Sequence, residues 1–301
     1  MRVLVSGASG FLGGALCRSL SERGHEPIAL VRRPGSGPDG VAEVVGDLAD
    51  AGSLRRALDS ASPEVVAHLA AEIASQRSAE RINEVNVEGT RRLIEAAEAA
   101  GARRIVFAST VVTGDAKGAL LDESSELPVE TAYGRSKQEG ERLVRESSLE
   151  DVVIRPSHVY GPGGWFESEF VARPRQPGRF AVIGRGTNLW DVVRDVDVIS
   201  AFALAIESAP AGTTYHVADD EPITFADFVA LTAREVGVGP PRRLPAWIAR
   251  AVAGSDPVTA VTRSARSSNA RIKRDLGWEP RFPTAEQGIP DAVAAMATAT
   301  G

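Results

Sequence analysis

Short apolar runs alternate with helical patterns along the first half of the chain, and no other feature limits the possible folds as strongly. Each run is continuously apolar, which is typical of strands whose two faces are both covered. Strands that alternate with helices at this spacing favour a parallel, doubly wound α/β sheet. The strands are expected at residues 3–5, 27–31, 41–45, 65–69, 104–108 and 152–154, and the helices at 15–23, 53–60, 79–100 and 132–147.

The pattern changes after residue 160, where a Gly-Pro-Gly-Gly run begins a stretch rich in proline, glycine and aromatic residues. A helical stretch and an apolar run then resume the earlier rhythm near residue 200. We therefore expect two parts of unequal regularity. Residues 1–160, joined again by 190–217, form the sheet domain, and residues 161–189 and 218–301 form a smaller C-terminal lobe.

The charge balance and the rarest residues exclude several classes of function. Acidic residues outnumber basic ones by 40 to 34, giving a net charge of −6, which argues against a broad nucleic-acid-binding face. A single cysteine excludes an internal disulfide framework, and the four histidines stand apart without metal-ligand spacing. No apolar run reaches the roughly 18 residues that a membrane span needs. We expect a cytoplasmic protein with no metal, membrane or nucleic-acid partner.

Three glycines near the N-terminus, Gly7, Gly10 and Gly13, lie between the first expected strand and the first expected helix. In this context the first glycine permits a tight turn, the second lets a pyrophosphate approach the backbone, and the third lets helix and strand pack closely. The helix N-terminus then supplies N–H donors and the positive end of its dipole. The loop therefore predicts a dinucleotide-binding site, with contacts from Gly7, Ser9, Gly10, Phe11, Leu12 and Gly13.

The spacing of these glycines and further motifs along the chain resemble those of the extended short-chain dehydrogenase/reductase family, which includes nucleotide-sugar epimerases, dehydratases and carbonyl reductases. The motifs that carry the resemblance are Gly46-Asp47-Leu48, His68-Leu69-Ala70-Ala71, Asn86-Val87-Glu88-Gly89-Thr90, Tyr133-Gly-Arg-Ser-Lys137, Arg155-Pro156, Val159-Tyr160-Gly161-Pro162-Gly163 and Leu276-Gly277-Trp278-Glu279-Pro280. They cover residues 1–165 closely and the rest loosely. The resemblance implies a Rossmann-type domain that binds NAD(H) or NADP(H), followed by a substrate-binding lobe.

Two arginines indicate which nicotinamide cofactor the protein prefers. Arg32 and Arg33 end the second expected strand, where a family member that prefers NAD usually carries an acid for the ribose hydroxyls. Guanidinium groups suit a 2′-phosphate instead, so we expect a preference for NADP(H), with NAD(H) also accepted. Exposed loop arginines without a ligand are the alternative. The resemblance implies further cofactor contacts from Asp47 and Leu48 beside the adenine, and from Leu69, Ala70, Ala71, Pro156 and His158.

Tyr133 and Lys137 form the expected proton-transfer pair. The chain has only three lysines and three tyrosines, yet these two lie four apart on one expected helix and so share a face. Free tyrosine has a pKa near 10 and is a poor base at neutral pH. A nearby ammonium and an oxidised nicotinamide would lower that pKa. Tyr133 could then exchange a proton with an alcohol or ketone, while Lys137 also holds the cofactor's ribose.

A hydroxyl donor is expected at the end of the preceding strand. Aligned on Gly114, the family's substrate-contacting serine or threonine falls at Ser109, with Thr110 as the second candidate and a strand-end cap as the structural alternative. Sugar-nucleotide dehydratases carry an Asp-Glu pair directly after this position, where this chain has Thr110 and Val111. Without that acid and base, dehydration lacks its proton-transfer groups. Thr113 also stands where family members commonly have a tyrosine.

The substrate side of the site is expected among the aromatic residues of the second part. Nucleotide-sugar enzymes of this family place an arginine just before an acid to bind the diphosphate, whereas here Trp190 precedes Asp191. Trp165, Phe166 and Trp190 could line a pocket for a flat or apolar substrate, or they could form the core of the lobe. The candidate anion anchors are Arg185, Arg194 and Arg263.

These features predict an NADPH-dependent carbonyl reductase that acts on a small-molecule carbonyl or alcohol. In it Ser109 orients the carbonyl oxygen, Tyr133 protonates it and Lys137 tunes Tyr133. The first alternative is a nucleotide-sugar 4-epimerase that uses the same triad with tightly bound NAD. The second alternative is a non-catalytic NADP-binding sensor, which would not need an acid–base group. The resemblance also implies a homodimer formed through the two longest helices.

Overall fold

The computed structural model describes residues 1–73, 78–175 and 181–299, and its chain divides into two units. Unit 1 consists of Met1–Thr110, Ala132–Arg155 and Ile199–Tyr215. Unit 2 consists of Val111–Thr131, Pro156–Val198 and His216–Gly301. The backbone therefore passes between the units several times, and each unit is assembled from segments that are distant in the sequence.

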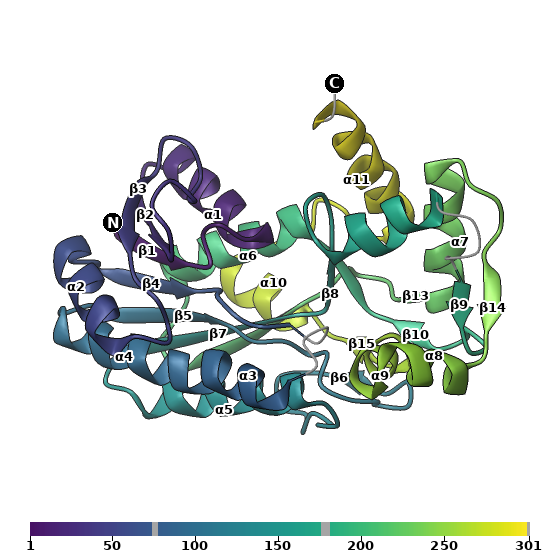
Figure 1. Ribbon diagram of the computed structural model, residues 1–301, viewed down its shortest axis with the longest axis horizontal. Coiled ribbons are helices and arrows are strands. Elements are labelled where there is room, and N and C mark those ends of the chain that lie inside the picture. The colour runs from purple at the N-terminus through teal and green to yellow at the C-terminus, as the bar shows by residue number, and fades with distance from the viewer. Residues whose placement is uncertain (74–77, 176–180, 300–301) are drawn as a thin grey trace. The chain divides into compact units, whose positions relative to one another are not determined.

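A seven-stranded sheet forms the centre of unit 1 (Figure 1). Its strands are β1 (Arg2–Ser6), β2 (Glu26–Val31), β3 (Ala42–Val45), β4 (Val65–His68), β5 (Arg104–Ala108), β7 (Glu150–Pro156) and β12 (Thr213–Val217). They lie in the order β12-β7-β5-β4-β1-β2-β3, and the pairs from β7 to β3 are parallel. Because β2 and β3 extend one side of β1 while β4, β5 and β7 extend the other, the sheet is doubly wound, as predicted.

Helices cover both faces of this sheet (Figure 1). They are α1 (Phe11–Glu22), α2 (Ala51–Ala61), α3 (Ala79–Asn83), α4 (Gly89–Ala99), α5 (Ala132–Glu146) and α6 (Asp195–Ser208), with a π-helical turn, η1 (Glu84–Glu88), between α3 and α4. One face carries α2, α4 and α5 over a core that includes Leu58, Leu93 and Val144, and the other carries α1 and α6. The single helix expected at 79–100 is therefore interrupted by the π-helical turn.

Unit 2 is built from short elements. They are β6 (Leu120–Leu121), β8 (His158–Tyr160), η2 (Glu167–Ala172), η3 (Arg173–Arg175), β9 (Ala181–Ile183), β10 (Leu189–Trp190), β11 (Val192–Arg194), β13 (Ile223–Thr224), α7 (Phe225–Val236), β14 (Arg242–Leu244), α8 (Ala246–Ala253), α9 (Ser255–Thr262), β15 (Arg266–Ser267), α10 (Ala270–Leu276) and α11 (Ala285–Ala299). The strands pair two by two, as β10–β13, β11–β8, β14–β9 and β15–β6. An aromatic core that contains Phe166, Trp190 and Phe228 packs against α7 and α11.

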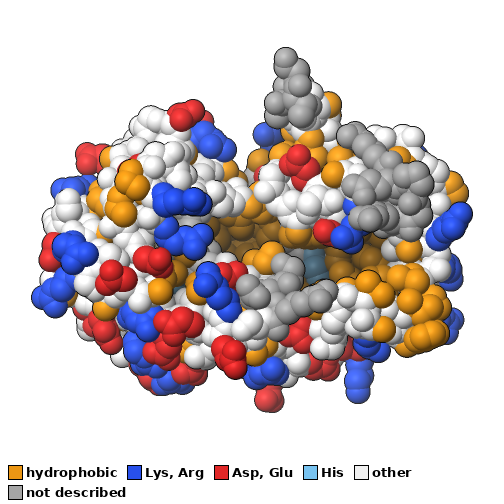
Figure 2. Space-filling view, viewed as in Figure 1, with side chains coloured by type: hydrophobic (Ala, Val, Ile, Leu, Met, Phe, Trp, Pro, Cys, Tyr) orange, Lys and Arg blue, Asp and Glu red, His pale blue; other side chains and the backbone are white. Residues whose placement is uncertain are grey.

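The surfaces of the two units differ in character. Figure 2 shows acidic and basic side chains interspersed over the visible face of unit 1, rather than one continuous basic area. On unit 2, hydrophobic side chains gather over α8 and α9, where Trp247 is 72% exposed. Within the described ranges no helix is both long and apolar enough to cross a membrane. The same ranges hold no group of three or more His, Cys, Asp or Glu side chains that could bind a metal ion.

Candidate active site

The glycine loop joins β1 to α1 with its backbone packed against the neighbouring strand end. Gly7 has a φ of +74°, and a Cβ there would lie 2.9 Å from the backbone N of Ala70. A Cβ on Gly13 would collide with the backbone of Gly7. Within the described chain, α1 begins at Phe11 with neither a side-chain cap nor an acid in its first turn. This loop and open helix N-terminus fit the pyrophosphate of the predicted dinucleotide.

Arg32 and Arg33 follow β2 directly, and both are exposed. In the described part of the chain neither guanidinium takes part in a hydrogen bond or an ion pair. β1 and β2 are parallel neighbours, with Ser6 beside Leu30. The two arginines therefore lie at the same end of the sheet as the glycine loop, where the strands have their carboxyl ends.

The other predicted cofactor contacts of unit 1 also follow the carboxyl ends of strands, at this same end of the sheet. Asp47 and Leu48 come after β3, and Asp47 is exposed whereas Leu48 is buried. Residues 69–71 come after β4, where Ser6 Oγ accepts the backbone N–H of Ala70 over 3.2 Å. Because parallel strands place their carboxyl ends together, these residues surround the region where such sheets bind dinucleotides.

His68, at the end of β4, is a core residue. It is fully buried, and its Nδ1 and Nε2 lie 2.7 Å from Ser6 Oγ and 2.9 Å from Thr90 Oγ1. Burial lowers the pKa of His68 to about 3. The ring is therefore neutral at physiological pH and links two elements of the fold.

α5 places Tyr133 and Lys137 one turn apart in its N-terminal half. The ammonium of Lys137 donates to the carbonyl oxygen of Ala108 over 2.7 Å. Its Nζ lies 5.0 Å from the ring centroid of Phe107 and 5.9 Å from that of Tyr133. Lys137 is buried whereas Tyr133 is half-buried. The helix thus brings the two predicted proton-transfer side chains together.

The pKa values of Tyr133 and Lys137 both depart from their ordinary values. Burial raises the pKa of Tyr133 to about 12. Burial also lowers the pKa of Lys137 to about 8. The ammonium is bonded to Ala108 and lies beside the tyrosine ring, so in this state desolvation of the phenol outweighs the attraction expected from Lys137.

The hydroxyl of Ser109 donates to Glu141 rather than standing free. Its Oγ lies 2.5 Å from Oε1 of Glu141, a buried residue one turn beyond Lys137 on α5. Arg155 on β7 donates two hydrogen bonds of 2.7 Å to the same carboxylate, and Arg145 donates one of 2.9 Å. Burial opposes the charge of Glu141, but the hydrogen bonds and positive charge of Arg155, with smaller contributions from Ser109 and Arg145, together hold the pKa of Glu141 below its usual value.

Sequence reasoning missed this network and a second one behind Tyr133. Asn86 lies in the π-helical turn η1, where its Nδ2 donates to Ser136 Oγ over 2.9 Å. Ser136 Oγ in turn donates to the backbone oxygen of Tyr133 over 2.8 Å. The side-chain oxygen of Asn86 accepts the backbone N–H of Glu72 over 2.7 Å. The motif containing Asn86 was the available signal, but its partners come from other segments.

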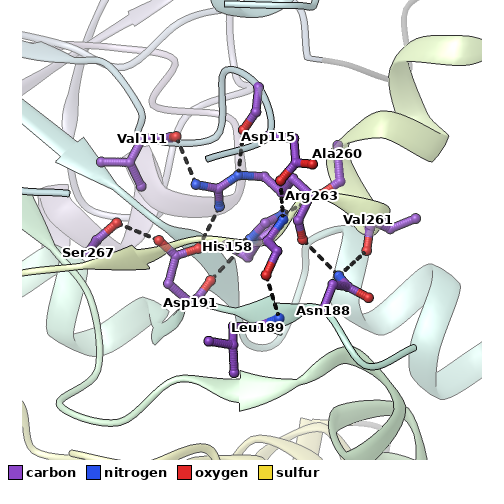
Figure 3. Close-up of polar contacts among 12 residues, drawn as sticks. Val111, Asp115, His158, Asn188, Leu189, Asp191, Ala260, Val261, Arg263 and Ser267 are labelled. Carbon is purple, nitrogen blue, oxygen red and sulfur yellow. Dashed lines mark hydrogen bonds and ion pairs between the residues drawn. The ribbon is translucent and has the colours of Figure 1, made fainter. Parts of the chain in front are cut away.

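Unit 2 contains a buried polar cluster around Asp191 (Figure 3). Arg263 donates to Oδ1 of Asp191 over 2.5 Å and to the backbone oxygens of Gly114 and Val111 over 3.1 and 3.2 Å. Burial alone would raise the pKa of Asp191, but the charge of Arg263 holds it below its usual range. Arg263 thus uses its donors inside the protein. Of the three candidate anion anchors, Arg185 alone is exposed.

His158 and the predicted substrate-side aromatic residues are largely buried. The ring nitrogens of His158 lie 3.0 and 3.1 Å from the backbone oxygens of Asp191 and Ala260 (Figure 3), and burial lowers its pKa. Its ring lies 4.2 Å from that of Trp190, centroid to centroid. Phe166 and Trp190 are fully buried, which is the core arrangement that the sequence left open, whereas Trp165 keeps some exposed surface.

Comparison with known proteins identifies the family. The model of the NAD dependent epimerase/dehydratase family matches residues 3–218. A 3-diazoavenalumate denitrifying reductase from a Streptomyces species is 34% identical over 96% of this chain and 99% of that protein. A UDP-glucose 4-epimerase from Mycolicibacterium smegmatis is 31% identical over 97% of both chains. The crystal structure of Thermus thermophilus UDP-glucose 4-epimerase in complex with NAD matches with a TM-score of 0.85 and 27% identity, covering 99% of this chain and 100% of that one.

The glycine loop, the Tyr133–Lys137 pair and the sheet order agree with this match. The chain therefore belongs to the NAD-dependent epimerase/dehydratase family and is an NAD(P)-dependent enzyme of the short-chain dehydrogenase/reductase type.

Proposed function

We propose that the protein is an NADPH-dependent carbonyl reductase. The observation that carries this proposal is the exposed pair Arg32 and Arg33 at the carboxyl end of β2. Two guanidinium groups suit the 2′-phosphate that distinguishes NADP(H), whereas an acid at this place would suit the ribose hydroxyls of NAD(H). A reductase consumes exchangeable NADPH, while an epimerase retains NAD because its reaction involves no net oxidation.

Tyr133 is the proton donor in this proposal. A pKa near 12 keeps the phenol protonated at neutral pH, which is the form that can protonate a carbonyl oxygen. Lys137, with a pKa of about 8, remains mostly an ammonium at pH 7 and can stabilise the phenolate that proton transfer leaves. Bound NADPH supplies the hydride that the carbonyl carbon receives.

For the hydroxyl that orients the carbonyl oxygen, Ser109 and Thr110 are the two candidates. A serine hydroxyl has one proton to donate, and that of Ser109 is directed to Glu141. Ser109 can therefore not donate to a carbonyl oxygen while this bond is intact. Thr110 follows it directly and was the second candidate from the sequence.

The substrate proposed is a carbonyl compound without a nucleotide diphosphate. Trp190 is fully buried where nucleotide-sugar enzymes carry an arginine, and the neighbouring Asp191 is neutralised by Arg263. Neither residue offers a cation to a diphosphate. The full-length similarity to a protein named as a reductase supports net reduction as the reaction.

A nucleotide-sugar 4-epimerase is the second candidate. The observation that favours it is the similarity, over 97% of both chains, to a UDP-glucose 4-epimerase. Such an enzyme would use the same side chains with NAD held through the whole cycle. The two candidates therefore differ in cofactor exchange and in net oxidation.

Two measurements on the purified protein separate these candidates. The first identifies any copurified nicotinamide nucleotide and asks whether it exchanges during gel filtration. The second follows NADPH oxidation across a panel of carbonyl compounds, with nucleotide sugars assayed for epimerisation in parallel. The reductase predicts exchangeable NADP(H) and carbonyl-dependent NADPH oxidation. Retained NAD with epimerisation and no net oxidation contradicts the reductase and supports the epimerase.

A further inference from the structure

The carboxylate of Glu43 holds the loop that carries Arg32 and Arg33. Glu43 lies on β3, which pairs in parallel with β2. Its Oε2 accepts the backbone N–H of Gly35 over 2.7 Å, and its Oε1 accepts that of Gly37 over 2.5 Å. Both oxygens are thus committed to the backbone that follows the two arginines, rather than to a guanidinium.

The loop backbone is folded closely around this carboxylate. Gly35 has a φ of +74°, a conformation that favours glycine. A Cβ on Gly37 would lie 2.6 Å from Oε1 of Glu43. Ser36 Oγ donates to the backbone oxygen of Arg33 over 2.6 Å. These contacts restrict the backbone of residues 33–37, which directly follows Arg32.

The arginine side chains on this loop, in contrast, are exposed and make no hydrogen bond or ion pair with the described residues. A ligand that engages them must order two long side chains, which costs conformational entropy. Holding their backbone in place beforehand lowers that cost. Two cations on a fixed loop are well suited to one dianionic phosphate.

We propose that Glu43 is a positioning residue for cofactor selectivity, because it holds the loop from which Arg32 and Arg33 meet the 2′-phosphate of NADP(H). This inference rests on the proposed preference for NADP(H). By its charge alone, an acid near this position would disfavour a phosphate. Positioning and repulsion therefore predict opposite effects when Glu43 is removed, so one measurement can separate them.

The test compares the affinities of adenosine 2′,5′-bisphosphate and 5′-AMP, measured by calorimetry, since this pair isolates the 2′-phosphate and requires no turnover. In Glu43→Ala, which removes both loop hydrogen bonds, we expect the affinity for the bisphosphate to fall about tenfold, equivalent to losing one hydrogen bond between an arginine and the 2′-phosphate, with 5′-AMP unchanged. Gly37→Ala, whose Cβ displaces the carboxylate, should give the same change.

Glu64→Ala is the matched control, because exposed Glu64 also accepts a backbone N–H, that of Arg2, at the opposite end of the strands. Both affinities should stay unchanged in this variant, and thermal unfolding of every variant verifies that the fold is retained.

The double variant Arg32→Ala/Arg33→Ala distinguishes the two possible failures. If it loses the bisphosphate preference while Glu43→Ala keeps or increases that preference, the role of Glu43 is overturned and the NADP(H) site stands. If the double variant itself keeps the preference, the proposed NADP(H) site is wrong, and the inference about Glu43 fails with it.

Discussion

Ser109 and Glu141 are joined by a hydrogen bond of 2.5 Å within unit 1, so a hydroxyl expected to face the substrate belongs to a buried charged network. Through the same carboxylate, Ser109 is linked to Arg155. This relationship gives Ser109 and Thr110 different expected roles, which mutation can separate.

Ser109→Ala should affect stability more than catalysis. It removes a hydrogen bond to a charged group, so we expect the free energy of unfolding to fall by about 1.5–3 kcal/mol. Chemical denaturation measures this change. Thr110→Val should instead lower kcat/KM for carbonyl reduction about 10²-fold, the effect of losing one donor to a developing oxyanion. A large fall in kcat/KM in Ser109→Ala, without one in Thr110→Val, would show that Ser109 orients the carbonyl oxygen.

Glu141→Gln should destabilise the protein by about 3–5 kcal/mol, because it leaves Arg155 buried beside a neutral amide. Glu139→Gln is the control on the same helix: Glu139 pairs with Arg142 at the surface, where an ion pair contributes at most about 1 kcal/mol. The free energy of unfolding of both variants is compared by denaturation at neutral pH. Equal losses in the two variants would contradict a special role for the buried carboxylate.

The stability that Glu141 contributes should depend on pH with a definite sign. Its pKa in the folded protein is held below the ordinary value of 4.5. The contribution is therefore fully present above about pH 4.5 and is lost as the pH falls through the folded pKa. The difference in Tm between wild type and Glu141→Gln should shrink on acidification. Melting curves whose separation does not change with pH would disagree with this expectation.

Tyr133→Phe should reduce turnover about 10²–10⁴-fold, because it removes the proton donor and leaves the ring in place. Binding of NADPH, followed by nucleotide fluorescence, should be unchanged, which shows that the nucleotide site is intact. Turnover equal to that of wild type would refute the assigned chemistry and favour the non-catalytic sensor.

The rate of NADPH-driven reduction should fall as the pH rises through about 8, the value to which burial lowers the pKa of Lys137. Above that pH the neutral amine no longer stabilises the phenolate of Tyr133. The pH profile of kcat/KM measures this alkaline limb. Lys137→Met should show a low rate without the inflection near 8, and a limb that persists in this variant belongs to another group.

The central sheet was predictable because its strands are continuous apolar runs between helical segments. Residues 104–108, for example, form a strand with the expected bounds. The first helix begins at Phe11 and not at residue 15. Gly13 has a low intrinsic helix propensity, but it lies inside the helix because only a glycine can pack this closely on the backbone of Gly7. Local propensity was overridden by a tertiary contact.

The networks behind the active site could not be read from periodicity. Helical spacing places Glu141 on the same face as Lys137, but its partners Ser109 and Arg155 arrive with two strands of the sheet. The π-helical turn that directs Asn86 likewise depends on contacts outside its own helix. The burial of Trp190 was undecidable because core and pocket aromatic residues have the same sequence pattern.

Glu141 accepts hydrogen bonds from Ser109 and Arg155. Each of these two residues lies within two residues of a point where the backbone passes into unit 2. The proton-transfer side chains and the network behind Ser109 therefore lie together in unit 1, up to the points where unit 2 begins. Such a division lets one ancestral chemistry be inherited intact by descendants that accept different molecules, which is how reductases and epimerases can share this scaffold.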